Sequence, residues 1–310
     1  MALSPIKKLL IGFAALSVAI TIMTANSLES LVLAKASVNV SNFLAGAASG
    51  GTSDSGDGEV ADIGPGDKKG DTGVTEEEKE QILQDKLESG EAELDEDGNI
   101  VVKMPETTEE IVEYYKKAIN YAKENGKDVV RVKDGAINYK GVVKAGGLSS
   151  VAESLMGMFM ASSAADIEET NVEWKADELP PSGVKSNLTA SGVKSAKIED
   201  NGDYFIVTIV ANDCVNPKAG DDGVGSISSV IEESQITGAI GSFPALQLNN
   251  IALEYEDVTA VATIDKTTGY LVALTTSSPC YLSLDAKLAV VSIDDACVGI
   301  QVISEFTVSY

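Results

Sequence analysis

Two copies of the pentapeptide SGVKS, at residues 182–186 and 191–195, carry the spacing Ser-x-x-Lys. Serine enzymes that pair a nucleophilic hydroxyl with a lysine use this spacing on a helical turn. Residues i and i+3 share a face of a helix but point to opposite faces of a strand. Because the glycine and the β-branched valine of the second copy disfavour a helix, we expect Ser191 and Lys194 to point apart. The motif therefore predicts no catalytic pair.

The strand expected after the second copy takes its register from a hairpin turn. Asn201-Gly202 is the strongest two-residue turn signal in the chain and joins GVKSAKIED to DYFIVTIVAND. This register places Ile198 opposite Phe205 and leaves the second SGVKS copy at the beginning of the strand.

Acidic residues at alternate positions, Glu93, Asp95 and Asp97, precede Gly98. Calcium loops place carboxylate ligands at such positions and a glycine at the sharp turn that follows. Met104 occupies the position where such a loop has its bidentate acid, and a strand is expected to follow instead of a helix. The three acids are therefore a calcium-site candidate, and an acidic hairpin turn is the favoured alternative.

The chain has three cysteines, Cys214, Cys280 and Cys297, so at least one of them has no disulfide partner within the chain. If the last hairpin turns at Asp294-Asp295, Cys280 and Cys297 lie too far apart to bond. A disulfide between Cys214 and Cys280 and three free thiols both stay open. Their spacing matches no zinc or redox site.

The composition removes several classes of chemistry. The chain has 48 acidic and 23 basic side chains, and its net charge of -25 repels phosphate backbones, so we expect no nucleic-acid partner. It has no histidine, which removes the usual general base, the commonest metal ligand and every Ser-His or Cys-His nucleophile. Arg131 is its single arginine, so several arginines cannot clamp an anion. No motif indicates a cofactor.

Residues 1–36 read as a signal peptide or a membrane anchor helix. Lys7 and Lys8 precede an uncharged run over residues 9–28, which is long enough to span a bilayer as a helix. The small-x-small pattern that ends at Ala36 favours a cleaved leader instead. Both alternatives place the rest of the chain outside the cytoplasm, either anchored by this helix or secreted.

Residues 37–74 are rich in Gly, Ser and Asp and predict a flexible, disordered linker, because they cannot bury enough apolar surface to order themselves. The sequence therefore predicts three parts: the leader, this linker, and an extracytoplasmic α+β domain over residues 75–310.

The folded domain should open with helices. Capping boxes at Thr75 and Thr107 predict one short charged helix and one strong amphipathic helix that ends at Gly126. Between them AELDEDGNIVVKM predicts a hairpin that turns on Asp97-Gly98. A third helix is expected from Ser149 to Ala161, whose methionines favour core filling over a plastic binding groove.

Alternation with period two dominates from Trp174 onward, with further turns at residues 266–269 and at Asp294-Asp295 and a short helix near residues 226–234. DVVRVKDGAINYKGVVKA is also strand-like, although Gly135 and Gly141 are expected to break it. The expected fold class is α+β: an antiparallel β-meander or curved sheet with two or three helices packed on one face, preceded by the apolar helix and the flexible linker.

Two segments, TTEEIVEYYKKAINYAKENGKDVVRVKDG and ATIDKTTGYLVALTTSSPCYLSL, resemble an uncharacterised group of exported proteins and lipoproteins of Gram-positive anaerobic bacteria. The likeness covers about residues 105–310. It implies export and a non-catalytic domain, and it assigns no site residue, because the group has no assigned activity. The chain departs from many members in lacking the lipid-anchor cysteine.

These features favour a membrane-tethered protein that is not an enzyme and that binds a cell-envelope component through its acidic domain. Membrane contact is expected through residues 9–28 only. Three alternatives stay open. They are a carrier of a small apolar ligand in a cavity between a curved sheet and the Met-rich helix, a hydrolase that works with carboxylates alone, and a pilin-like filament subunit.

Overall fold

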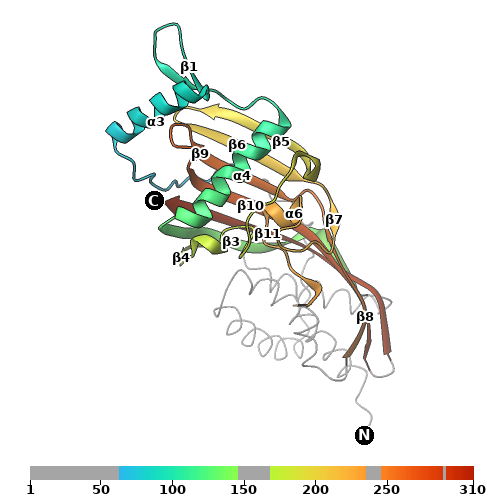
Figure 1. The fold of residues 1–310 in the computed structure, drawn as a ribbon. Helices are drawn as coiled ribbons and strands as arrows, with labels where there is room; N and C mark the ends of the chain where they lie inside the picture. The colour runs from blue at the N-terminus through green and yellow to red at the C-terminus, as the bar shows by residue number, and fades with distance from the viewer. Residues whose placement is uncertain (1–62, 146–167, 235–245, 289–290) are drawn as a thin grey trace.

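A computed structural model of the protein describes residues 63–145, 168–234, 246–288 and 291–310 (Figure 1). The predicted leader, with its apolar run over residues 9–28, and the predicted Met-rich helix lie outside the described residues. Of the helices in the described ranges, none combines the length and the apolarity that a membrane crossing demands.

An antiparallel sheet of nine strands forms the body of the protein, so the α+β class is confirmed. Seven strands follow one another in the order β4-β3-β11-β10-β9-β6-β5, while β8 pairs with the distal part of β10 and β7 pairs with β8. The C-terminal strand β11 thus lies inside the sheet, between β10 and β3. The strands are β3 (Asp128–Ala145), β4 (Glu168–Trp174), β5 (Val193–Asn201), β6 (Tyr204–Ala211), β7 (Cys214–Val215), β8 (Leu246–Tyr255), β9 (Thr259–Asp265), β10 (Leu271–Leu288) and β11 (Val291–Ser309).

Two helices begin at the predicted capping boxes. α3 (Glu76–Ser89) follows Thr75 and α4 (Thr108–Asn125) follows Thr107, and in each the threonine and the N3 glutamate bond to each other's backbone amides. α4 lies along one face of the sheet, whereas α3 has no buried residue and stands at one end (Figure 1). The difference follows from the sequence, because α4 carries an apolar stripe and α3 is charged on every side.

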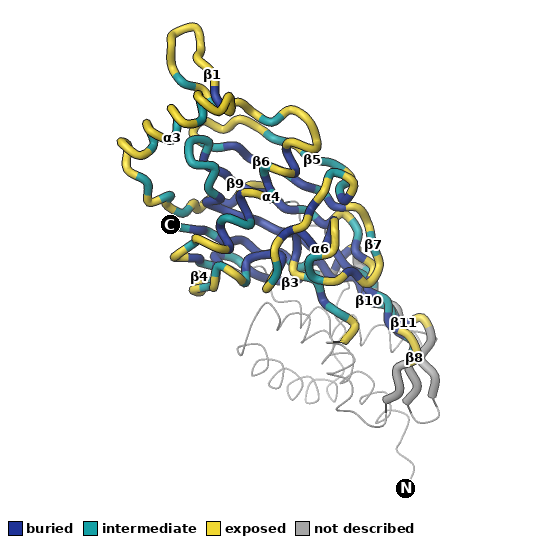
Figure 2. The backbone as a smooth tube through the Cα atoms, viewed as in Figure 1, coloured by how far each residue is buried: buried dark blue, intermediate teal, exposed yellow. Residues whose placement is uncertain are grey.

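The main core lies between α4 and the sheet. Tyr115 and Ile119 of α4 are fully buried in one cluster with Val207 and Ile264 of the strands. Each such side chain stabilises the fold by about 2 kcal/mol. Figure 2 shows the central strands in dark blue and, largely in yellow, α3 with the neighbouring hairpin of β1 (Ala92–Leu94) and β2 (Ile100–Val102).

Short segments between strands extend the helical layer beyond α4. They are η1 (Ala176–Glu178), η2 (Ala190–Gly192) and α6 (Val224–Ile227). α6 begins earlier than the helix predicted near residues 226–234 and has a single turn. Leu179, which caps η1, and Ile227 of α6 join the same core cluster as α4, so these segments pack on the same core as the helix.

The β5–β6 hairpin turns one residue later than predicted. Ile198 pairs with Val207 instead of Phe205, so the loop is Gly202-Asp203. Gly202 has φ +66°, a left-handed conformation that favours glycine, and it takes the first loop position. The partner shifts by two residues, so every side chain keeps its predicted face of the sheet.

The predicted turn at Asp294-Asp295 is wrong. β11 begins at Val291, which pairs with Leu288 of β10, and runs through both aspartates. Asp295 lies in a bulge with φ +57°, where its amide donates a 2.8 Å hydrogen bond to the Asp285 carboxylate. The acidic pair therefore marks a positive φ inside a strand and no reversal of the chain.

The predicted breaks in β3 are also absent, since β3 is one strand of 18 residues. Gly135 pairs regularly with β11. Near Gly141 the ladder bulges, because residues 139–142 lie opposite Gly299 alone and Lys140 has φ +52°. A side chain at Gly299 would come 2.5 Å from the carbonyl oxygen of residue 139, so the bulge requires glycine there.

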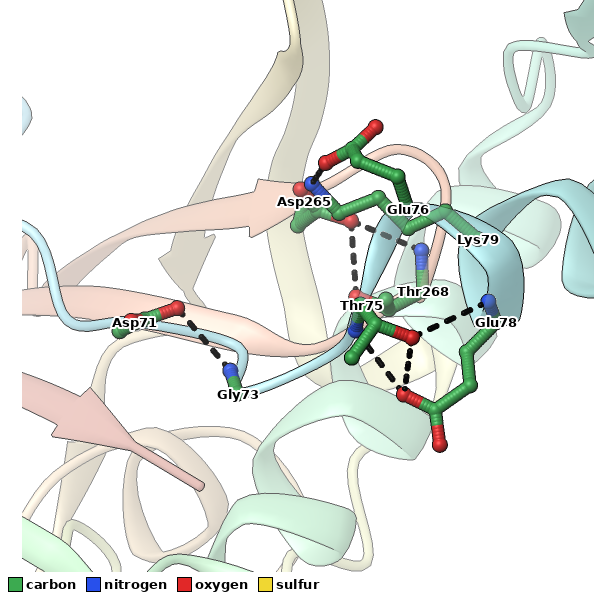
Figure 3. A network of polar contacts seen from close by, with 8 residues as sticks. All are labelled: Asp71, Gly73, Thr75, Glu76, Glu78, Lys79, Asp265 and Thr268. Carbon is green, nitrogen blue, oxygen red and sulfur yellow. Dashed lines mark hydrogen bonds and ion pairs between the residues drawn. The ribbon is translucent and has the colours of Figure 1, made fainter.

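Residues 63–74, which we call the strap, are the described part of the segment predicted as a linker, and they contact the sheet. The Gly70 amide donates a 2.9 Å hydrogen bond to the Val272 carbonyl, and the Tyr310 amide donates a 3.0 Å hydrogen bond to the Asp71 carbonyl. Figure 3 shows the strap passing Asp71 and entering the Thr75 cap of α3 beside the β9–β10 turn. The strap thus connects α3 with β11.

Candidate functional site

Both SGVKS copies have their lysines engaged by acids. Ser191 is exposed on the single turn η2, just before β5. The Lys194 ammonium lies 2.6 Å from Asp213 Oδ1 and 2.7 Å from Asp257 Oδ1. In the first copy, Lys185 pairs with a glutamate of α4. These ion pairs connect β5 with the loops at Asp213 and Asp257, and they connect the first copy with α4.

The acids of the calcium candidate lie on the hairpin of β1 (Ala92–Leu94) and β2 (Ile100–Val102), which forms as predicted. Asp95 accepts hydrogen bonds from the amide of Asp97 at 3.0 Å and from the amide of Asn99 at 2.8 Å. Hydrogen bonds from Asn99 hold the pKa of the Asp95 carboxyl below its usual value. Across the described ranges, no group of three potential metal ligands converges.

All three cysteines are free thiols, so the disulfide alternative is wrong. Cys214 and Cys280 each pair with Tyr255, which lies on the strand between them. Burial raises the pKa of Cys280 and raises that of Cys214 to about 11. Raised thiol pKa values make the thiolate scarce and the cysteines weak nucleophiles.

A cavity of about 70 Å³ opens between the sheet and the loop layer. Strands β3, β10 and β11 contribute one wall, and the η1 loop with the segment after α6 contributes the other. Its apolar lining includes Val230, Ile231, Ile300, Val302 and Phe306. Hydroxyl groups come from Ser182, Ser228, Ser229, Thr276, Ser278 and Ser304.

Arg131 on β3 is the cationic residue of the described lining. It is only 2% exposed, and its Cζ lies 4.2 Å from the centroid of the Trp174 ring. Nη1 lies 3.4 Å from Asp134 Oδ2, an ion-pair distance without a hydrogen bond. The Nε and Nη1 atoms are buried and have no hydrogen-bond partner. Unpartnered buried donors on a charged group are uncommon in folded proteins.

Asp134 forms the ion pair with the guanidinium and is not part of the described cavity lining. Its Oδ1 accepts a 2.7 Å hydrogen bond from the Ser304 hydroxyl. Burial raises the pKa of Asp134 above its usual value and lowers that of Arg131 below its usual value, and each charge opposes the effect on the other. Arg131 thus brings a charge to the cavity lining, and Asp134 compensates part of that charge.

Lys123 of α4 fixes the opposite wall. Its ammonium donates hydrogen bonds to the carbonyl oxygens of Asp177, Leu179 and Pro181. Burial lowers the pKa of Lys123 to about 8. The same loop accepts a 3.2 Å hydrogen bond from the Trp174 indole to the Glu178 carbonyl. One buried lysine therefore positions the loop that closes the cavity and holds the ring under Arg131.

Sequence reasoning missed this site, although it carried two signals. Arg131 lies among valines in a segment whose apolar residues are typical of a buried strand, and Trp174 is the single tryptophan. No spacing rule links the two, because β-sheet pairing between β3 and β4 brings them together.

Comparison of the chain with protein-family models, with curated proteins and with solved structures yields no match. The resemblance to exported proteins of Gram-positive anaerobes stays a prediction, and the case for a function rests on the cavity.

Proposed function

We propose that the folded domain is a non-catalytic binding module that takes one small, largely apolar ligand in the cavity between the sheet and the η1 loop. The observation that carries this proposal is the cavity itself, with its apolar lining and a few convergent polar groups. It differs from the carrier alternative of the sequence analysis, which placed the cavity between the sheet and the Met-rich helix, because the described wall is formed by the η1 loop and the segment after α6.

The size of the cavity limits the ligand. Pockets for drug-sized ligands run from about 300 to 1,000 Å³, and a single water needs about 10 to 15 Å³ of the same kind of volume. A cavity of about 70 Å³ therefore has room for roughly five water-sized groups. A short ligand fits, and a long-chain lipid does not.

The chemistry of the lining supports binding over catalysis. Glu178 is the one carboxylate of the described lining, and Lys175 Nζ donates a 2.8 Å hydrogen bond to it. Hydrolysis by carboxylates alone needs two acids about 5 to 10 Å apart in the same cleft. The Cys280 thiol in the lining has a raised pKa and is a poor nucleophile.

The module would act outside the cytoplasm, attached to the cell envelope through residues 9–28 or released after cleavage. The leader sequence supports this part of the proposal. Fractionation of cells, with the mass of the protein's N-terminal peptide, tests it. Recovery of the intact chain in the cytoplasm would contradict export.

A cavity-filling substitution tests the binding proposal. Val302 lines the cavity, so Val302→Phe should occupy the ligand's volume, whereas Val172→Phe changes an exposed valine of β4. NMR titration of both variants and the wild type with alcohols, amides and carboxylates of three to six carbons gives the affinities. We expect saturable binding of at least one compound, lost in Val302→Phe and kept in Val172→Phe. Absence of saturable binding to the wild type, or equal binding by Val302→Phe, would overturn the proposal.

A further inference from the structure

We propose that the ligand of this cavity is a short-chain monocarboxylate of about three to six carbons and that Arg131 binds its carboxylate. This inference rests on the proposed function and adds the chemical class of the ligand. It starts from the unpartnered nitrogens of a side chain that is 2% exposed and lines the cavity.

The contacts that Arg131 makes within the chain leave hydrogen-bonding capacity unused. The cation–π contact with Trp174 places Cζ 4.2 Å from the ring centroid and satisfies neither Nε nor Nη1 with a hydrogen bond. Asp134 stands 3.4 Å from Nη1 and forms no hydrogen bond with it. Nε and Nη1 lie on different edges of the guanidinium plane, and each edge forms a two-donor fork with Nη2. Such a fork matches the two oxygens of a carboxylate.

Asp134 already compensates the charge of Arg131, but Nε and Nη1 keep N–H donors that an anionic acceptor could use. An arginine remains protonated even where burial lowers its pKa, so the cavity holds a permanent cation in a site of low dielectric. Asp134 lies outside the described lining, and the Glu178 carboxylate is already bonded to Lys175. A ligand carboxylate would therefore approach Arg131 with neutral hydroxyl groups as its other polar neighbours.

The apolar side chains of the lining indicate that the part of the ligand beyond the carboxylate is a hydrocarbon tail. The apolar part of the lining would contact a hydrocarbon tail; it consists of Val230, Ile231, Ile300, Val302 and Phe306. The same side chains would remove water from a dianion and offer its second charge no hydrogen bond in return. The volume of about 70 Å³ admits a tail of a few carbons. A monocarboxylate with a short alkyl tail satisfies both conditions, and inorganic phosphate satisfies neither.

The net charge of the protein predicts how the affinity for a carboxylate depends on ionic strength. At -25 the protein repels anions from a distance, so local contacts must provide the affinity for the carboxylate. Added salt screens the long-range repulsion and leaves the buried contact largely intact. Affinity for the carboxylate should therefore rise modestly, by about twofold, when the ionic strength increases from low to physiological values.

A matched pair of probes tests the inference on the unaltered full-length protein. Butyrate and butyramide have the same shape and differ in charge. We expect butyrate to bind at least ten times more tightly than butyramide, because a site built for a carboxylate rejects the analogue that leaves its donors unpaired. Equal affinities would overturn the carboxylate assignment and leave the proposed function standing. Binding of neither compound would count against both.

Variants at Arg131 locate the recognition. Arg131→Gln alone would leave Asp134 as an uncompensated buried charge, so the double variant Arg131→Gln with Asp134→Asn keeps the site neutral. This double variant should bind butyrate and butyramide equally. Retained discrimination in a variant that unfolds as cooperatively as the wild type would overturn the role of Arg131. Phosphate that displaces butyrate at equal concentration would overturn the preference for an alkyl carboxylate.

Discussion

The ammonium nitrogen of Lys123 lies 2.8 Å from the carbonyl oxygen of Pro181, and this contact joins the last turn of α4, the longest described helix, to the loop that closes the cavity. The same ammonium also bonds to the carbonyls of Asp177 and Leu179. Three carbonyls of one loop therefore depend on one side chain, and the loop's position depends on the charge state of that side chain.

Replacing Lys123 by methionine should loosen this loop. The change keeps the length of the side chain but leaves three carbonyls without their donor, which lowers the free energy of unfolding by about 2 kcal/mol. Urea unfolding measures the loss, and hydrogen exchange should show faster exchange over residues 175–186. Lys185→Met is the matched control on the same loop, since its exposed ion pair with Glu124 contributes at most about 1 kcal/mol. Equal effects of the two substitutions would contradict the clamp.

The same lysine predicts a pH dependence of stability. Its pKa is about 8 in the folded protein and near 10.5 when unfolded, so the unfolded state binds more protons between these values. Stability contributed by Lys123 should therefore rise as the pH increases from 8 to 10.5. The raised pKa values of Cys214 and Cys280 have the opposite sign, because an unfolded thiol ionises first. The difference in the free energy of unfolding between the wild type and Lys123→Met isolates the contribution of the lysine. If this difference does not change between pH 8 and 10.5, the pKa of Lys123 is not lowered in the folded protein.

The elements that local chemistry controls could be predicted from the sequence. Two capping boxes located α3 and α4, and alternation located the strands of the sheet. Predictions failed where a local signal has two structural outcomes. A positive φ at Asp295 fits a turn as well as a bulge, and only the pairing of β10 with β11 decides between them.

The cavity and the strap could not be predicted, because both depend on contacts between distant segments. Arg131 meets Trp174 through strand pairing, and Lys123 meets the η1 loop through the packing of α4. The strap has a linker-like composition, yet its glycines allow the backbone to lie directly against β11, which composition alone cannot reveal.

Calcium should have no effect on the β1–β2 hairpin. The carboxylate of Asp95 already accepts hydrogen bonds from Asp97 and Asn99, so a cation would have to displace them. The melting temperature should be equal in EDTA and in millimolar calcium. A calcium-dependent rise that disappears in Asp95→Asn would instead identify a metal site at these acids.

The strap should detach when Gly70 is replaced by alanine. A Cβ at this position would lie 1.7 Å from the carbonyl oxygen of Val308. Because the contact is between two backbone segments, it cannot be relieved by the movement of a flexible side chain. Gly64→Ala is the matched control, because a Cβ there meets nothing within 4 Å. We expect Gly70→Ala to lower the free energy of unfolding by about 1 to 3 kcal/mol and Gly64→Ala to leave it nearly unchanged.

The rate of proteolysis measures whether the strap is attached to the sheet. Lys68 donates a 3.1 Å hydrogen bond to Asn171, and the ammonium of Lys69 lies 4.1 Å from the centre of the Tyr204 ring. An attached strap is a poor substrate, since cleavage needs an extended segment free of the sheet. A lysine-specific protease should therefore cut after these residues faster in Gly70→Ala than in the wild type or in Gly64→Ala. Equal cleavage of all three proteins would mean that the strap is released from β11 in solution and that the C-terminal strand is stable without it.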